Sequence, residues 1–216
     1  MKEDISALLC CRRRSLLSLT TLLAFCAATS AAPLSGKDLA AALQRGGYVI
    51  VMRHASSPLT PPDPAQADPD NLQHERQLDE GGRASARALG AAFHRLRIPI
   101  GQVLSSPTYR ALETARLADL TPPHTYPQLG DAGQSMALDP NGTRGGWLRG
   151  KVGQPPTAGT DTLIITHAPN IREAFPTDGA DLADGEALIF RPDGRGGASL
   201  AARVKIQDWP ILGADS

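Results

Sequence analysis

The sequence of 216 residues predicts an α/β protein, a three-layer α/β/α sandwich with a mostly parallel central sheet and an antiparallel edge. Short apolar runs of strand length, at 48–54, 100–104 and 161–166, alternate with helical segments. Such alternation is typical of a parallel sheet that is covered on both faces. Two final runs, 186–191 and 198–206, flank a Pro-Asp-Gly turn and predict an antiparallel hairpin at one edge.

The first residues of the chain are typical of a secretory signal peptide. Lys2 and the arginines at 12–14 precede an uncharged apolar stretch at 15–28, and small residues follow at 29–32. The stretch is too short for a spanning helix with these flanks. We therefore expect a signal peptide at 1–32, a domain at 33–216 and a periplasmic or secreted location. An uncleaved membrane anchor is the alternative.

All three cysteines, Cys10, Cys11 and Cys26, lie inside this leader. The mature chain would then form no disulfide, use no cysteine nucleophile and bind no zinc through cysteine. Acidic and basic residues are equal in number, 22 of each. The sequence therefore shows no excess of basic residues of the kind that binds nucleic acid. The length suffices for one domain with a proper core.

The first half of the mature chain divides into two helices around a strand and a loop. Leu39 and Leu43, four residues apart, predict a helix over 36–44 that ends at a glycine pair. Residues 57–71 are rich in proline, aspartate and alanine and predict a loop. Asp79 is a suitable N-cap for a helix that runs to 96. Its apolar stripe consists of Ala84, Ala88, Leu89, Ala92, Phe93 and Leu96.

The second half contains one further clear helix and one stretch without a clear periodic pattern. Ser106 as N-cap and Pro107 in the first turn predict a helix that runs to about Ala118. Residues 121–160 are irregular, with a short helix near Trp147, and another short helix begins at Asn170. No internal repeat is present.

Two strands of the predicted sheet each end in a histidine. Arg53 and His54 follow the first strand, and His167 follows the strand 161–166. Carboxyl ends of parallel strands meet at the edge where ligands bind in open α/β sheets. Either histidine alone would be interpreted as an ordinary loop residue, but together they indicate one small ligand between two imidazoles.

An arginine near a helix start adds an anion-binding element. Residues 105–110 read Ser-Ser-Pro-Thr-Tyr-Arg, so Arg110 lies close to the N-terminus of the predicted helix. Helix N-termini favour anions, and a guanidinium matches the oxygens of a phosphate. By itself Arg110 would be interpreted as a solvated helix arginine.

Four ordered pieces of the chain resemble the histidine phosphatase superfamily, the group that contains the cofactor-dependent phosphoglycerate mutases and many small phosphatases. The pieces are Arg53-His54, residues 76–83 leading into 88–90, residues 105–110 followed by Glu113-Thr-Ala, and Thr166-His167. They occur in the family's order between about Gly47 and Phe190. The resemblance implies a phosphoglycerate mutase-like fold and, for an exported chain, a small phosphatase.

The resemblance also implies roles for individual residues. His54 would attack phosphorus and become phosphohistidine, while Arg53, Arg110 and His167 would hold the equatorial oxygens. For attack His54 must be neutral, with its tautomer set by a partner on the other nitrogen. No metal and no cofactor are expected, because the cations are part of the protein.

The departing alkoxide needs a proton, which the family takes from a carboxylic acid. That acid lies between the arginine helix and the last histidine strand, or just after the second histidine. Residues 168–170 contain no carboxylate. Asp131 is therefore the candidate, Asp139 the runner-up and Glu186 a further alternative. An ordinary loop aspartate is the competing interpretation of Asp131.

The chain departs from the family pattern at Ala55, where the family has glycine. Residues that grip phosphoglycerate in the mutases are not identifiable. Ser57 and Asn170, and also Ser56, could donate hydrogen bonds to substrate, although small polar loop residues are more often turn formers. His74, His94 and His124 have no motif support and are interpreted as surface residues, and no spacing suits a metal.

These features predict a metal-independent phosphatase that acts on a phosphorylated small molecule, such as a phosphosugar. Neither a nucleic-acid partner nor a stable membrane association after cleavage is expected. Two alternatives remain: a phosphomutase, and a binding protein for phosphorylated ligands that keeps the pocket without turnover.

Overall fold

The computed structural model describes residues 32–131 and 142–214, and every structural statement below refers to these residues. The predicted signal peptide lies outside this part of the chain except for Ala32, and so does Asp139. Within the described ranges, no helix combines the length and the apolar character needed to cross a membrane.

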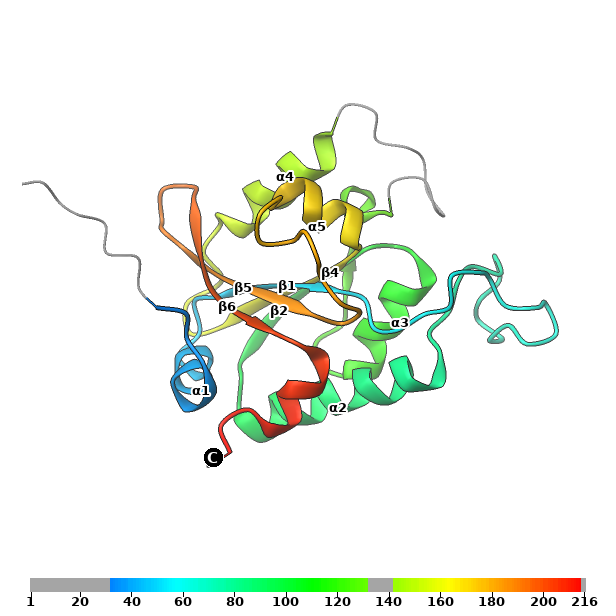
Figure 1. Ribbon diagram of the computed structural model, residues 1–216, viewed down its shortest axis with the longest axis horizontal. Coiled ribbons are helices and arrows are strands. Elements are labelled where there is room, and N and C mark those ends of the chain that lie inside the picture. Colours follow the sequence, from blue (N-terminus) through cyan, green and yellow to red (C-terminus); the bar gives the residue numbers. More distant parts are fainter. Residues whose placement is uncertain (1–31, 132–141, 215–216) are drawn as a thin grey trace, which may run out of the picture. The chain divides into compact units, whose positions relative to one another are not determined.

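Six strands form one sheet in the order β3-β2-β4-β1-β5-β6 (Figure 1). The first four in that order pair in parallel, and β5 and β6 pair antiparallel at the other edge. This arrangement confirms the predicted mostly parallel sheet with an antiparallel edge. The strands are β1 Val49–Arg53, β2 Ile100–Ser105, β3 His124–Thr125, β4 Asp161–Thr166, β5 Ala187–Pro192 and β6 Ala198–Val204.

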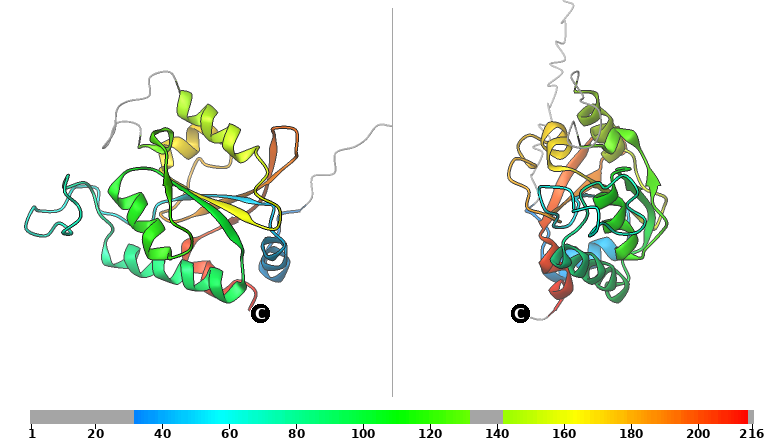
Figure 2. Two further views of the ribbon diagram at one scale, coloured as in Figure 1. Left: turned by 180° about the vertical axis from the view of Figure 1, so that it is seen from behind. Right: turned by 90° about the vertical axis from the view of Figure 1, so that its right-hand side faces the viewer.

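Helices cover both faces of the sheet, as Figures 1 and 2 show. One face carries α1 Gly36–Gln44, α2 Glu80–Leu96, α3 Tyr109–Ala118 and the C-terminal 3₁₀ turn Ile206–Ile211. The other carries α4 Thr143–Val152, α5 Ala168–Ala174 and the 3₁₀ turn Pro127–Leu129.

Side chains of β1 alternate between two cores. Ile50 and Met52 pack with the first group of helices, whereas Val49 and Val51 pack with α4 and α5. Successive side chains of a strand point to opposite faces. Burial on both faces therefore explains why this strand reads as an unbroken apolar run.

The start of α3 differs from the prediction. The helix begins at Tyr109 with Thr108 as its N-cap, rather than Ser106. The backbone N–H of Ser106 still donates to the Ile165 carbonyl of the sheet (2.9 Å), so the chain can turn into a helix only after this residue. Ser106 thereby becomes available to the site described below.

The buried face of α2 also differs from the predicted stripe. Ala84 is exposed, whereas Ala86 and Gly90 are buried. At Gly90 the helix lies so close to α3 that an added Cβ would stand 1.9 Å from the Ala118 carbonyl oxygen. Small residues rather than large apolar ones mark this contact, and a count of apolar residues does not detect them.

The strand β3 and the 3₁₀ turn Pro127–Leu129 were not predicted from the sequence. Each contains only two or three residues. The Tyr126 N–H donates to the Ser105 carbonyl (3.0 Å), so tertiary pairing stabilises this short extended piece. The helix expected near Trp147 is present as α4.

A buried carboxyl group joins the starts of β1 and β4. The Tyr48 N–H donates to Oδ1 of Asp161 (2.8 Å), and Oδ2 of this fully buried residue has no hydrogen-bond partner among the described residues. Burial raises the pKa of Asp161 from 3.8 to about 7. The native state therefore retains this proton at pH values where the unfolded chain has lost it.

We expect the stability of the protein to fall as the pH rises from about 4 to about 7, because the native carboxyl group resists ionisation in this window. Asp161→Asn keeps the acceptor for Tyr48 and cannot ionise. The difference in unfolding free energy between variant and wild type should grow by on the order of 2–4 kcal/mol from pH 4 to pH 8.

Urea denaturation at both pH values measures this difference. Asp38→Asn, at an exposed position of α1, is the matched control and should leave the pH dependence unchanged. A difference for Asp161→Asn that does not change with pH would show that the carboxyl group ionises normally.

Candidate active site

Three chain segments leave the sheet side by side at the carboxyl ends of its parallel strands. Arg53 pairs with Thr166 in the register of β1 and β4, and the His54 N–H donates to the Thr166 carbonyl (3.0 Å). The segment after β2 joins them through the bond from Ser106 N–H to Ile165. Strand register thus brings the two histidine segments and the start of α3 to one place, as predicted.

Arg110 connects the chemical groups of this site. It is the second residue of α3, and its side chain is completely buried. Nε donates to Nε2 of His54 (3.1 Å), and Nη2 lies 3.2 Å from Nδ1 of His167. Nη2 also forms an ion pair with Oδ2 of Asp131 (3.0 Å). The predicted residues His54, Arg110, His167 and Asp131 therefore form one contact cluster.

Hydrogen bonds define the tautomer of His54. Nδ1 lies 2.8 Å from the carbonyl oxygen of Ala55, which can only accept, so Nδ1 carries the proton. Nε2 is then the unprotonated nitrogen that accepts from Arg110. This is the arrangement that a nucleophilic imidazole requires, with the lone pair of Nε2 directed into the site.

Thr114 holds the backbone that fixes this tautomer. Its hydroxyl donates to the Arg110 carbonyl (2.8 Å) and accepts from the Ala55 N–H (3.1 Å). Ala55 is buried and does not adopt a left-handed backbone. Alanine therefore fits where the family has glycine. Thr114 belongs to the Glu-Thr-Ala piece of the motif, but only the fold reveals its contact with Ala55.

Both imidazoles of the site are neutral near pH 7. The pKa of His54 is lowered to about 3, mainly by burial and also by the charges of Arg110 and Arg53, although the hydrogen bond to the Ala55 carbonyl raises it. Burial, followed by neighbouring His54 and Arg110, lowers the pKa of His167 well below its usual value. A neutral His54 retains the lone pair that attack on phosphorus needs.

Two hydroxyl groups hold the ring of His167. Nε2 lies 3.0 Å from Oγ of Ser106 and 3.2 Å from Oγ1 of Thr108. The ring centroids of His54 and His167 are 5.1 Å apart, in an edge-to-face arrangement. From the sequence alone Ser106 is only a candidate helix cap, because a serine before Pro107 carries no other signal.

Arg53 approaches the site from β1 with one donor unused. Nη1 donates to the Leu182 carbonyl (3.0 Å), and Nη2 pairs with Asp184 (2.5 Å). Its Nε is buried and has no hydrogen-bond partner among the described residues. A buried N–H without an acceptor is costly, so this group is suited to an anion that enters the site.

Asp131 is held in place by the chain on both sides of His167. Thr166 donates to the Leu129 carbonyl (2.8 Å), and Nδ2 of Asn170 donates to the Gln128 carbonyl (3.0 Å). Both bonds fix the turn that precedes Asp131. The amide of Asn170 thus positions this loop, although the sequence pattern predicts a hydrogen bond from it to substrate.

The other polar candidates have partners of their own. Oγ of Ser57 donates to the Gln77 carbonyl (2.8 Å), and Oγ of Ser56 donates to Oδ2 of Asp79 (2.6 Å). Asp79 caps α2 through the Gly82 N–H, as predicted. The Glu186 carboxylate accepts from Arg203 and from the Ala183 N–H, which leaves Asp131 as the carboxylate in contact with Arg110.

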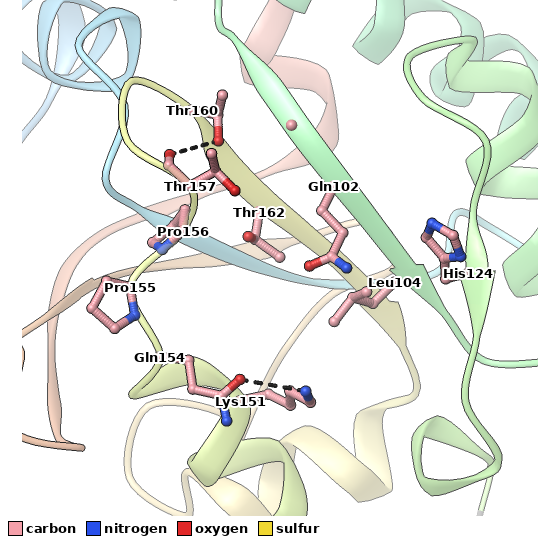
Figure 3. A pocket seen from close by; sticks show the side chains of 11 residues that line it. Gln102, Leu104, His124, Lys151, Gln154, Pro155, Pro156, Thr157, Thr160 and Thr162 are labelled. Atoms are coloured by element: carbon pink, nitrogen blue, oxygen red, sulfur yellow. Dashed lines mark hydrogen bonds between the residues drawn. The ribbon is translucent and has the colours of Figure 1, made fainter.

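A separate hollow of about 280 Å³ lies near the opposite ends of β2 and β4 (Figure 3). Gln102, Thr162 and Lys151 are among the residues around it, and Nζ of Lys151 donates to Gln154 (3.3 Å). The hollow contains none of the catalytic candidates.

Over the described ranges, no group of three or more histidine, cysteine or acidic side chains could hold a metal ion.

Comparison with known proteins agrees with this geometry. The sequence pattern of the histidine phosphatase superfamily (branch 1) matches residues 49–133. The resemblance to this superfamily is confirmed. The matched range includes Arg53, His54, Arg110 and Asp131. His167 lies beyond this range and reaches the same cluster because β4 pairs with β1. A search of curated protein sequences finds no match.

Two solved structures share the fold of this chain. The protein histidine phosphatase SixA in complex with tungstate is 19% identical, with a TM-score of 0.52; the match covers 74% of this chain and 98% of SixA. The product of the open reading frame Rv3214 from Mycobacterium tuberculosis is also 19% identical, with a TM-score of 0.50, over 73% and 97% of the two chains.

Proposed function

We propose that the protein is a phosphatase that hydrolyses a phosphate monoester through a phosphohistidine on Nε2 of His54. One observation carries this proposal: a neutral imidazole presents its unprotonated nitrogen to the guanidinium of Arg110 at 3.1 Å. A nucleophile and a cation that binds phosphate therefore face each other, as phosphoryl transfer to the protein requires.

The phosphoryl group would enter between these two side chains. Its oxygens replace His54 as the acceptor for Nε of Arg110, and the buried Nε of Arg53 supplies a further donor. His167 also contacts Arg110, through Nδ1 at 3.2 Å from Nη2. Donors that are fixed before the reaction stabilise the charge of the transition state without reorganisation.

Two balanced steps complete the reaction. Nε2 of His54 forms a bond to phosphorus while the ester oxygen departs with its electron pair and takes a proton from Asp131. Water then attacks the phosphohistidine, gives a proton to Asp131, and releases inorganic phosphate and free His54. Asp131 acts as an acid in the first step and as a base in the second. This mechanism uses no metal ion and no cofactor.

The position of Asp131 favours turnover over simple binding. Asp131 and His54 contact the same guanidinium, so the candidate acid lies next to the space where the phosphoryl group would sit. A binding protein for phosphorylated ligands would have no use for a carboxylate there, since its charge repels phosphate. A phosphomutase needs a second binding mode for its product, and no residue is assigned to one.

For the biological setting we propose export and a phosphorylated small molecule, such as a phosphosugar, as substrate. Export is supported by positions 2–32, where a basic region is followed by an apolar stretch and then by small residues. The mass of the N-terminus of the protein recovered from the producing cell tests export: cleavage near residue 32 is expected. An intact Met1 would contradict it.

We expect His54 to carry acid-labile phosphate during turnover. Brief incubation with a labelled phosphate monoester, followed by an alkaline quench, should trap label on the wild type and none on His54→Ala. Exhaustive chelation should leave the rate unchanged. Label of equal amount on His54→Ala would disprove the nucleophile, and a loss of rate that zinc or magnesium restores would disprove the metal-free mechanism.

We expect Asp131→Asn to affect substrates according to their leaving groups. Esters of alkyl alcohols need the proton and should react about 10²–10⁴-fold more slowly, whereas an aryl phosphate with an acidic phenol should be nearly unaffected. The amide keeps an acceptor for Arg110, which limits the structural change. Kinetics with a series of leaving groups measure the effect.

The control for this series is Asp184→Asn, which alters a carboxylate that pairs with Arg53 rather than with Arg110. Its losses should be similar for alkyl and aryl esters. Equal losses for both substrate classes in Asp131→Asn as well would show that Asp131 only holds Arg110.

A further inference from the structure

The chain that carries His54 contacts a segment that includes the start of the family piece 76–83, a piece to which the sequence assigned no chemical role. Residues 75–78 follow the proline-rich loop and precede α2. Two sets of hydrogen bonds fix this segment, one to the chain after His54 and one to the start of α3. Arg76 lies at its centre and is buried, with 8% of its surface exposed.

The first set of bonds ties the segment to the chain that follows His54. Nε of Arg76 donates to the Pro58 carbonyl (2.5 Å), and its Nη2 donates to the Ser57 carbonyl (3.2 Å). Oγ of Ser57 donates in return to the Gln77 carbonyl (2.8 Å). The guanidinium is thereby oriented by the backbone three and four residues after the nucleophile.

The second set ties the same segment to α3. Oε2 of Glu75 accepts from the Tyr109 N–H (3.0 Å), one residue before Arg110. The Leu78 N–H donates to Oε2 of Glu113, one turn further along the helix. Arg76 therefore lies between the two pieces of chain that carry His54 and Arg110.

Electrostatic effects also connect Arg76 with the residues of the site. Arg76 opposes protonation of both His54 and His167, and its own pKa is lowered by burial and by Arg110 and Arg53. Arg76 thus acts electrostatically on the site together with Arg53 and Arg110 and with the carboxylates of Asp131 and Asp184. Without Arg76 the cations and anions of this group would be equal in number.

We propose that Arg76 is a third arginine of the phosphate pocket and binds the phosphoryl group of the substrate directly. This inference rests on the proposed function. A phosphate monoester is largely a dianion at pH 7. When Asp131 holds the proton for the leaving group, Arg53, Arg76 and Arg110 together with Asp184 leave two positive charges, which match the two negative charges of the substrate.

The competing role for Arg76 is structural, because it also anchors the loop through Ser57 and Pro58. Two variants separate the roles. Arg76→Lys keeps the charge but loses the planar fork, and Arg76→Gln removes the charge. If Arg76 binds phosphate, charge decides affinity. If it only anchors the loop, both variants lose the fork and should behave alike.

The experiment measures binding of inorganic phosphate and of orthovanadate by calorimetry at pH 8, together with the melting temperature of each variant. Arg76→Gln should weaken both anions at least tenfold, and Arg76→Lys should retain most of the affinity. With an aryl phosphate as substrate, Arg76→Gln should raise KM by a similar factor. Arg87→Gln, at an exposed position of α2, should match the wild type.

Affinity of Arg76→Gln within twofold of the wild type would overturn the inference. So would equal weakening in the lysine and glutamine variants with equal losses of melting temperature, since that result shows an anchor. A wild type that binds neither anion and turns over no phosphate ester would instead refute the proposed function itself.

Discussion

One buried guanidinium organises the site of this protein. Arg110 has no exposed surface, so its charge must be compensated by the groups it touches. His54, His167 and Asp131 supply these contacts, and each comes from a different part of the chain. Removal of any partner would leave a buried charge with fewer acceptors. The folded core and the chemistry of the site therefore depend on the same contacts.

Burial above all keeps both imidazoles of the site neutral, and the charge of Arg110 adds to this effect. Which nitrogen of His54 is free depends on a longer chain of bonds, from the Ala55 carbonyl to Thr114 and back to the Arg110 backbone. Helix α3 thus supplies both the cation and the hydroxyl that orients the nucleophile.

A network of charges holds the long loop between β1 and α2 against this helix. Arg83 pairs with Glu113 (2.6 Å) and with Asp68 (2.8 Å), while the Tyr109 hydroxyl donates to Asp68 and Asp70. Gly82 permits close contact with the chain after His54, since a Cβ there would lie 2.1 Å from the Ser56 carbonyl oxygen. Helix α3 consequently holds both the loop and the site residue Arg110.

The sequence by itself determined the layers of the fold and the main chemical groups of the site. Apolar runs such as Tyr48-Val-Ile-Val-Met and the helical stripes follow from burial on two faces and on one face, which is a local periodic signal. Arg53, His54, Arg110 and His167 stand where strands end or a helix starts, so their convergence also followed from position. Asp131 was selected differently, from the family resemblance and from the absence of a carboxylate at 168–170, and the structure places it against Arg110.

Tertiary structure alone decided the contacts between segments distant in the sequence. The role of Ser106 beside His167, that of Thr114 beside Ala55 and the positioning of the Asp131 loop by Asn170 each join residues more than twenty positions apart. The fold likewise decided the contacts of Arg76 with the Ser57 and Pro58 carbonyls, 19 and 18 positions away. A polar residue carries no periodic signal for its partner, because hydrogen-bond geometry exists only after the strands have set the register.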